Sequence, residues 1–320
     1  MITTALTRMF GLRHPIVLAP MGAVSGGGLA AAVSNAGGLG LVGGGYGDPA
    51  WLRTELELVK SATQRPWGVG LITWAIEPAV LEFALSFRPA AFMLSFGDPR
   101  PWVPAIKAAG CRLICQVQTV ADARLAKDAG ADVVVAQGTE AGGHGAQRAT
   151  LPLVPAVVDA VAPLPVLAAG GIVDGRGLAA ALALGAEGAL IGTRFYASTE
   201  ALVHPSAKAR VVAAQGGDTV RTGVFDIVRG YVWPAPYTGR ALTNGFVQRW
   251  HGREDALRSA VESERAAFRA AAAAGDFDTA MVWAGEGVDL IGDIPAAGTL
   301  VERIAADAET RLCGAAALVT

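Results

Sequence analysis

A short apolar run, a turn and a helix-forming stretch recur in that order from Pro15 to about Ala197. Apolar runs this short, bounded by turn residues, are typical of parallel strands that are buried on both faces. The pattern therefore predicts eight strands. They are expected at Ile16–Ala19, Leu39–Val42, Gly68–Ile72, Ala91–Leu94, Leu113–Val117, Val133–Ala136, Pro165–Ala168 and Ala189–Ile191.

The stretches between these runs carry helix start and stop signals. Predicted starts are Asp48 before Pro49, Asp98 before Pro99, Thr119 three residues before Asp122, and Asp174. Predicted ends are Ala36-Gly37-Gly38, Ala109-Gly110, Ala129-Gly130 and Leu184-Gly185. Eight strand-helix units at about 25-residue spacing predict an α/β fold that closes as a TIM (β/α)8 barrel. An open doubly wound sheet is the alternative, and it is disfavoured because no run resembles an edge strand.

The pattern changes after Thr199. Residues 204–215 still look helical, whereas 216–245 is rich in aromatic residues, glycine and proline, has no clean period, and is expected to be irregular. Residues 254–274 are predicted to form one amphipathic helix. Thr299 and Glu302 resemble a capping box that opens a last helix. We therefore expect residues 1–200 and 285–320 to form the barrel, and 201–284 to form a small, mainly helical cap over its mouth.

Composition excludes several classes of protein. The 320 residues are 52% apolar, carry a net charge of −2 and contain no basic block, which argues against a nucleic-acid partner. The three cysteines form no CxxC pair, so we expect a reducing, cytoplasmic setting. The apolar stretch 151–173 contains four prolines, and no secretory signal opens the chain, so no membrane association is expected. A homodimer is compatible with the sequence.

The segment Gln137-Gly138-Thr139-Glu140-Ala141-Gly142-Gly143-His144-Gly145 is the strongest candidate for a functional site. It follows a predicted strand, at the end where barrel enzymes gather their catalytic groups. Gly142 and Gly143 give His144 little to pack against and let the backbone approach a ligand closely. We therefore expect His144 to be catalytic, with Glu140 as the carboxylate near enough to orient it.

Two more glycine turns are predicted at the same end of the barrel. Gly170-Gly171 follows the seventh strand, and Gly192-Thr193 follows the eighth. These are the positions at which a TIM barrel holds a phosphate group. The two turns together make one phosphate-binding site, and no dinucleotide-binding motif stands in the right context. The ligand is therefore expected to be a mononucleotide and not a dinucleotide.

Other motifs are weaker. The stretch 38–43 matches G-x-G-x-x-G but lies partly within a predicted strand, so its glycines are interpreted as packing residues. Asp132 begins a strand at the far end from His144, which leaves too few ligands for a metal site. Cys115 lies in an apolar run and is expected in the core. The aromatic residues Phe225, Tyr231, Trp233 and Tyr237 are expected to cover the barrel mouth.

Several segments together resemble the nitronate monooxygenase family, formerly called 2-nitropropane dioxygenases, which are FMN-dependent TIM barrels. The segments are PIVLAPM, NAGGLGLVGGG, QGTEAGGHG, LPVLAAGGIVDGRGLAAALALGAEGALIGTRF and HPSAKARVVAA. The resemblance implies oxidation of a small-molecule nitronate or nitroalkane by O2, with FMN as cofactor. It implies that His144 takes a proton from the carbon beside the nitro group, or positions the anionic nitronate.

The resemblance also implies a set of cofactor contacts. Gly170, Gly171, Gly192 and Thr193 would hold the FMN phosphate. Pro20, Met21 and Gly22 would lie against the flavin ring, and Gly142 and Gly143 would also contact the cofactor. Gln116 and Gln137 would reach the flavin or ribityl oxygens.

Two alternatives stay open. The same motifs resemble NAD(P)H-dependent flavin reductases of quinones or of enoyl-acyl-carrier-protein thioesters. Gln116 stands where some of those relatives carry lysine, and a neutral amide stabilises an anionic reduced flavin less well than an ammonium does. The second alternative is a barrel that binds a phosphorylated ligand without redox chemistry.

Overall fold

The structure, a computed structural model, describes residues 1–315 and 317. Its main sheet has eight parallel strands in the order β1-β9-β8-β6-β5-β4-β3-β2. Every apolar run that was expected to be a strand is one, so the TIM-barrel prediction is confirmed. The strands are β1 (Ile16–Leu18), β2 (Gly40–Gly45), β3 (Trp67–Ile72), β4 (Ala91–Ser95), β5 (Arg112–Val117), β6 (Val133–Gln137), β8 (Val166–Ala169) and β9 (Ala189–Ile191).

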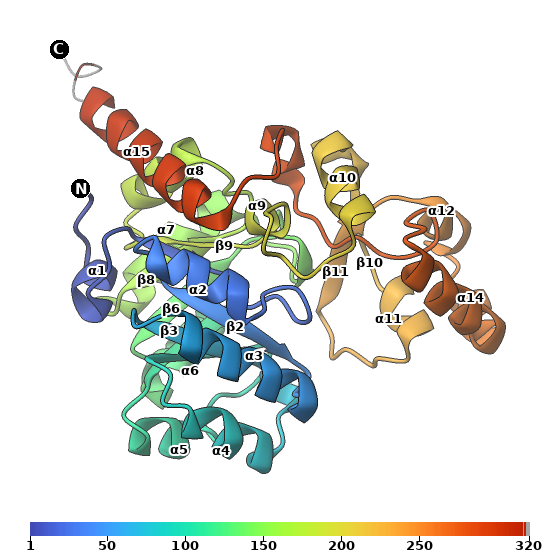
Figure 1. Cartoon of the computed structure of the whole chain (residues 1–320), viewed down its shortest axis with the longest axis horizontal. Coiled ribbons are helices and arrows are strands. Elements are labelled where there is room, and N and C mark those ends of the chain that lie inside the picture. Colours follow the sequence, from blue (N-terminus) through green and yellow to red (C-terminus); the bar gives the residue numbers. More distant parts are fainter. Residues whose placement is uncertain (316, 318–320) are drawn as a thin grey trace.

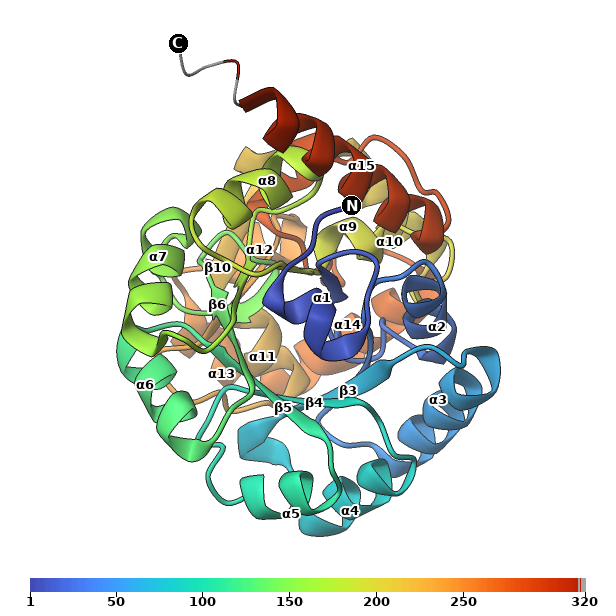
Figure 2. The same cartoon turned by 90° about the vertical axis from the view of Figure 1, so that its left-hand side faces the viewer.

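The barrel is nearly closed between its first two strands. Val17 of β1 forms a bridge with Leu39, and the amide of Leu18 donates to the Leu39 carbonyl at 2.9 Å. Helices surround the strands as a ring (Figure 2). They are α2 (Gly27–Asn35), α3 (Pro49–Ala62), α4 (Pro78–Ser86), α5 (Val103–Ala108), α6 (Val120–Ala129), α7 (Thr150–Val161), α8 (Gly175–Ala183), α9 (Thr193–Tyr196) and α15 (Ala297–Ala315).

One end of the barrel is closed by the N-terminal helix α1 (Ala5–Phe10), which lies across the opening in Figure 2. Its residues Leu6 and Phe10 belong to the apolar cluster inside the barrel, with Leu41 and Leu190. The cap segment, residues 201–284, lies at the other end, where Figure 1 shows it to the right of the barrel. Helix α1 therefore blocks the barrel interior at the end opposite the cap segment.

The cap segment contains more regular structure than its sequence predicted. A three-stranded antiparallel sheet joins its strands β10 (Thr219–Thr222) and β11 (Thr238–Leu242) to β7 (Gly143–Gly145) of the barrel loop. The expectation of an irregular stretch was wrong because these strands are short and pair with a distant partner. The helices here are α10 (Pro205–Ala213), α11 (Val224–Arg229), α12 (Gly245–Trp250), α13 (Glu254–Ser259) and α14 (Val261–Ala274).

Two details of the cap segment correct the sequence analysis. The single helix expected over 254–274 is two helices, because the chain turns at Ala260, which caps α13 and precedes α14. Phe225 does not cover the mouth. Its side chain is fully buried against Phe246 and Phe268, where it forms the core of the segment.

Helix capping was predicted well at three of five starts. Asp48, Thr119 and Asp174 each accept backbone amides at the first turn of α3, α6 and α8. Asp98 instead closes a turn with Arg100, and α5 begins only at Val103. Thr299 lies inside α15, which begins at Ala297, so the predicted capping box was wrong. No helix of the described residues is long and apolar enough to cross a membrane.

The glycines of the stretch 38–43 pack closely, as expected. A Cβ on Gly40 would lie 1.9 Å from the Ala30 carbonyl oxygen, and one on Gly43 would lie 2.2 Å from that of Met21. Helix α2 and the turn after β1 can therefore approach β2 only because these positions have no side chain. Cys115 is buried in the core, as expected.

Candidate active site

A cavity of about 450 Å³ opens at the carboxyl ends of the barrel strands. Its volume falls in the range of small-molecule and cofactor sites. The structure brings all twelve residues of the predicted site to its wall. They are Pro20, Met21, Gly22, Gln116, Gln137, Gly142, Gly143, His144, Gly170, Gly171, Gly192 and Thr193.

The two glycine turns form one side of the cavity. Gly170 and Gly171 have φ values of 104° and 72°, a region that residues with a Cβ rarely adopt. Gly192 precedes the short helix α9, and no side chain caps the amides of this helix. The amides that begin α8 are different, because the Asp174 carboxylate already accepts from them. The first turn of α9, with Gly170 and Gly171 beside it, thus offers backbone donors suited to an anion.

His144 sits on β7, between the barrel and the cap segment. Its backbone lies opposite Gly239 of β11, and its carbonyl accepts from Gln137 Nε2 at 3.0 Å. Gln137 Oε1 in turn accepts from Gln116 at 3.1 Å and from Gln118 at 2.8 Å. Gln137 therefore supports the histidine loop, and its partner Gln118 was not identified from the sequence.

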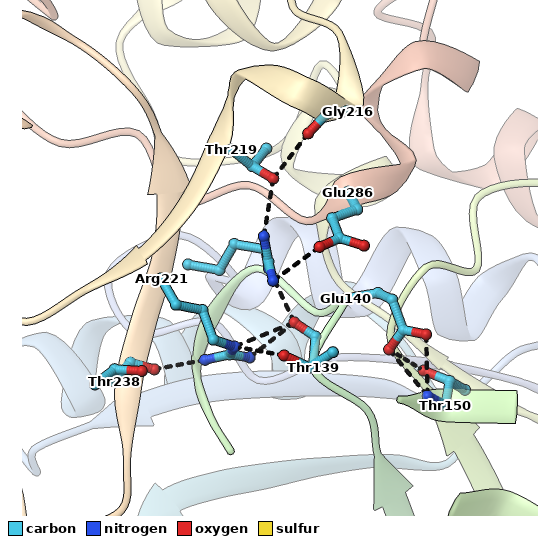
Figure 3. Close-up of polar contacts among 9 residues, drawn as sticks. Thr139, Glu140, Thr150, Gly216, Thr219, Arg221, Thr238 and Glu286 are labelled. Atoms are coloured by element: carbon cyan, nitrogen blue, oxygen red, sulfur yellow. Dashed lines mark hydrogen bonds and ion pairs between the residues drawn. The ribbon is translucent and has the colours of Figure 1, made fainter. Parts of the chain in front are cut away.

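The carboxylate that contacts His144 is Asp226, on α11 of the cap segment. His144 Nε2 lies 3.0 and 2.9 Å from the two Asp226 oxygens, and both side chains are at most 10% exposed. The expectation that Glu140 orients the histidine was wrong. Both Glu140 oxygens accept from the Thr150 amide, so its side chain points to the start of α7 (Figure 3).

Burial lowers the pKa of His144 below its usual 6.5, although the hydrogen bond and charge of Asp226 oppose that shift. The positive charges of Arg229 and Arg221 also lower it. Burial therefore favours the neutral imidazole, which is the state a general base requires.

Aromatic rings form part of the cavity wall. Trp233 stacks on His144 with 3.5 Å between ring centroids and 5° between planes. Tyr46 stacks on Tyr231 at 4.0 Å, and its hydroxyl accepts from Trp233 Nε1 at 2.9 Å. Phe96, from the turn after β4, packs edge-on against Trp233. The cap segment thus supplies Tyr231 and Trp233, and the barrel loops supply Tyr46 and Phe96.

Two arginines, the half-buried Arg221 and the buried Arg240, hold the start of the histidine loop. Arg221 Nε donates to the Thr139 hydroxyl at 2.9 Å, and Arg240 Nε donates to the Thr139 carbonyl at 2.9 Å (Figure 3). Burial and the nearby charge of Arg240 lower the pKa of Arg221 to about 10. Glu286 lies 2.8 Å from Arg240 and partly offsets the two positive charges. The loop that carries His144 is therefore anchored to strands of the cap segment.

The other titratable residues considered from the sequence lie away from the cavity. Asp132 pairs with Lys107 and Arg112 at the other end of β6. His204 accepts from the Ser206 amide at the start of α10, and His251 contacts Thr222. Burial raises the pKa of Cys115 to about 12, so its thiol is not a nucleophile near neutral pH.

The chain is similar to several known proteins along nearly its whole length. The family model described as nitronate monooxygenase matches residues 3–79 and 75–307. A nitronate monooxygenase of Neurospora crassa is 35% identical, over 94% of this chain and 90% of the relative. The structure of FabK from Thermotoga maritima superposes with a TM-score of 0.90 at 32% identity, and covers both chains completely.

A second solved structure, nitroalkane oxidase from Streptomyces ansochromogenes, superposes with a TM-score of 0.84 at 30% identity. The alignment covers 98% of this chain and all of that one. The family match and these relatives extend over the barrel and the cap segment alike. The chain therefore belongs to the nitronate monooxygenase family, whose members are flavin-dependent oxidoreductases.

Proposed function

We propose that the protein oxidises alkyl nitronates and nitroalkanes with O2, yielding a carbonyl compound and nitrite. The observation that carries this proposal is an imidazole, only 10% exposed and hydrogen-bonded to a carboxylate, on the wall of a cofactor-sized cavity in a chain of this family. The base can remove the α-proton of a nitroalkane, and a preformed nitronate can enter the same cavity without that step.

We propose FMN as the flavin. The turns at Gly170-Gly171 and Gly192-Thr193 would hold its single phosphate. The G-x-G-x-x-G stretch of residues 38–43 runs into β2 and does not lie between a strand and a helix, as a dinucleotide-binding motif would. The amide of Gln116 and the turn Pro20-Met21-Gly22 would contact the ring system. Bound FMN would supply the electron-accepting and oxygen-activating chemistry that protein side chains lack.

The residues of this chain would handle the proton and the surroundings of the substrate. His144 accepts the α-proton, and Asp226 offsets the positive charge that then forms on the imidazole. Tyr46, Tyr231 and Trp233 make the cavity wall apolar and limit access of water. An apolar wall also favours the hydrocarbon part of a nitroalkane.

We further propose that residues 1–200 and 285–320 act as the FMN-binding barrel and that 201–284 act as its cap. The cap would hold the base and narrow the mouth, since Asp226 and Trp233 both come from it. A cytoplasmic location is proposed from the cysteines, because the buried thiols of Cys111 and Cys115 are unpaired and suit a reducing compartment.

The direct test is turnover. Purified protein supplied with FMN and preformed ethyl nitronate should consume O2 and release nitrite, with acetaldehyde as the organic product. Denaturation should release FMN and no FAD. Absence of nitronate-dependent oxygen uptake by protein that carries flavin would contradict the proposal.

A second candidate is an NAD(P)H-dependent flavin reductase of quinones or enoyl thioesters. It is favoured by one observation, the TM-score of 0.90 with FabK, which exceeds the 0.84 with nitroalkane oxidase. The family match and the nitronate monooxygenase relatives favour the first candidate.

The lowered pKa of His144 predicts the pH dependence of nitroalkane oxidation. The base works only when deprotonated, so a pKa below 6.5 keeps it active as the pH falls through that value. We expect the acid limb of the kcat/KM profile for neutral nitroethane to have its midpoint below pH 6.5. The control His251→Gln should keep the same profile. An acid limb with its midpoint above pH 6.5 would contradict a lowered pKa of His144.

The aromatic wall predicts selectivity for chain length. Tyr231→Ala removes a ring that stacks on Tyr46 at the mouth without touching His144. We expect kcat/KM for 1-nitrohexane relative to nitroethane to rise by about tenfold, the scale of a few apolar contacts in a pocket. Trp233→Ala should also change this ratio and should in addition slow proton removal, since Trp233 stacks on the base. If the ratio of kcat/KM for 1-nitrohexane to that for nitroethane in both variants equals the ratio in the control Trp250→Phe, these rings do not determine the preference for chain length.

A further inference from the structure

The hydrogen bond between His144 and Asp226 determines which imidazole nitrogen can act as a base. A carboxylate only accepts hydrogen bonds, and both Asp226 oxygens lie within 3.0 Å of Nε2. The contact therefore requires a hydrogen on Nε2. In a neutral imidazole the lone pair then lies on Nδ1.

Nδ1 is available for this role. Within residues 1–315 and 317, no group forms a hydrogen bond with His144 Nδ1, whereas Nε2 and the backbone carbonyl both have partners. The ring itself is held in place by Trp233 on one face and by the pairing of β7 with β11. His144 lines the cavity, so a substrate can approach its ring.

We propose that Asp226 is the positioning residue of the base: it holds His144 as the Nε2–H tautomer, so that Nδ1 takes the substrate proton. This inference rests on the proposed function for the identity of the substrate. Asp226 and the stacking residue Trp233 both belong to the cap segment. The packing of that segment against the barrel therefore brings the base together with the residues that position it.

The proton-transfer step balances without another reagent. The α-carbon–hydrogen bond breaks, the proton forms a bond with Nδ1, and the electron pair moves onto the nitro group to give the nitronate. The imidazolium that results is hydrogen-bonded to Asp226, whereas the positive charges of Arg221 on β10 and of Arg229, which lies 3.9 Å from an Asp226 oxygen, oppose it. Asp226 is the negative charge among these groups, so it is the one that favours the protonated ring.

The tautomer can be measured on the unmodified protein. Nitrogen-15 spectra of histidine-labelled holoenzyme at pH 8 should show one imidazole with its proton on Nε2 and a bare Nδ1. The signals that disappear in His144→Asn assign it among the four histidines. Detection of a proton on Nδ1 of neutral His144 would overturn the proposal. This measurement does not depend on turnover, so its result tests the tautomer of His144 independently of the proposed function.

Kinetics of Asp226→Asn test the consequence for catalysis. An amide can donate as well as accept, so both tautomers become accessible, and kcat/KM for neutral nitroethane should fall by about 10²-fold. Loss of the carboxylate should also move the acid limb of the pH profile to lower pH, because Asp226 raises the pKa of His144. Preformed nitronate needs no base and should be affected by about twofold at most.

The matched control is Asp255→Asn, the same change at an exposed site of the cap segment. It should keep the wild-type rates and acid limb. Equal losses for nitroethane and nitronate in Asp226→Asn, with an unmoved acid limb, would mean that Asp226 is only structural and would overturn the proposal. If the wild-type protein fails to oxidise nitronate, the proposed function is wrong. If His144 nevertheless carries its proton on Nε2, Asp226 still positions the ring as proposed.

Discussion

Replacement of His144 by asparagine is expected to lower turnover of neutral nitroalkanes by about 10²–10⁴-fold while FMN stays bound. Neutral nitroalkanes lose the α-proton slowly in water, and His144 is the imidazole that lines the cavity. Preformed nitronate has already lost this proton and should be oxidised with a much smaller loss. The measurement is a pair of kcat/KM values, one for each ionisation state of the same compound.

The control His251→Gln removes an imidazole outside the cavity and should change neither rate. Equal losses for both substrates in His144→Asn would mean that His144 binds or positions the anion and does not remove the proton. If neither substrate is affected, the assignment of His144 is wrong.

Substitution of Gly192 by valine is expected to abolish flavin binding. The backbone φ of Gly192 is −109°, and a Cβ there would lie 3.5 Å from the Ala19 Cβ, so the fold accepts a side chain. The branched methyl groups would instead occupy the cavity beside the amides of α9. Gly171→Val should have the same effect, with added strain because its φ is 72°.

Flavin occupancy is measured from the visible spectrum and from FMN released on denaturation. Gly292→Val is the matched control, because a Cβ at this exposed glycine meets no atom within 4 Å. Thermal unfolding should show that Gly192→Val remains folded. Full flavin occupancy in both Gly171→Val and Gly192→Val would contradict the phosphate assignment.

The barrel was predictable from sequence because its strands are local, buried on both faces and bounded by glycine turns. Each strand needs only its own residues to be recognised, as the run Val133–Ala136 shows. The glycine turns were equally visible, since Gly170 and Gly171 have positive φ values that only glycine adopts readily. Barrels of this fold class place their active sites at the carboxyl ends of the strands, so the location of the site was predictable as well.

The residues contributed by the cap segment were not predictable in the same way. Asp226 lies 82 positions from His144 in the chain, in a six-residue helix with no distinctive sequence period. Glu140 was the nearer carboxylate in sequence, yet it turns away to Thr150. Phe225, the residue before Asp226, points into the core of the segment. Phe225 is fully buried whereas Tyr231 and Trp233 are half-buried, and this difference is set by tertiary packing, which no local pattern records.

The most direct test of the proposed nitronate oxidation adds one of two reductants to separate, oxygen-free samples of the flavin-loaded protein. The visible spectrum of the flavin is then recorded. Preformed ethyl nitronate should change the flavin absorbance at once, and NADH or NADPH should leave it unchanged. Admission of O2 to the nitronate sample should restore the yellow colour and release nitrite. Rapid bleaching by NADH or NADPH, with no response to nitronate, would contradict the assignment and identify the protein as a flavin reductase.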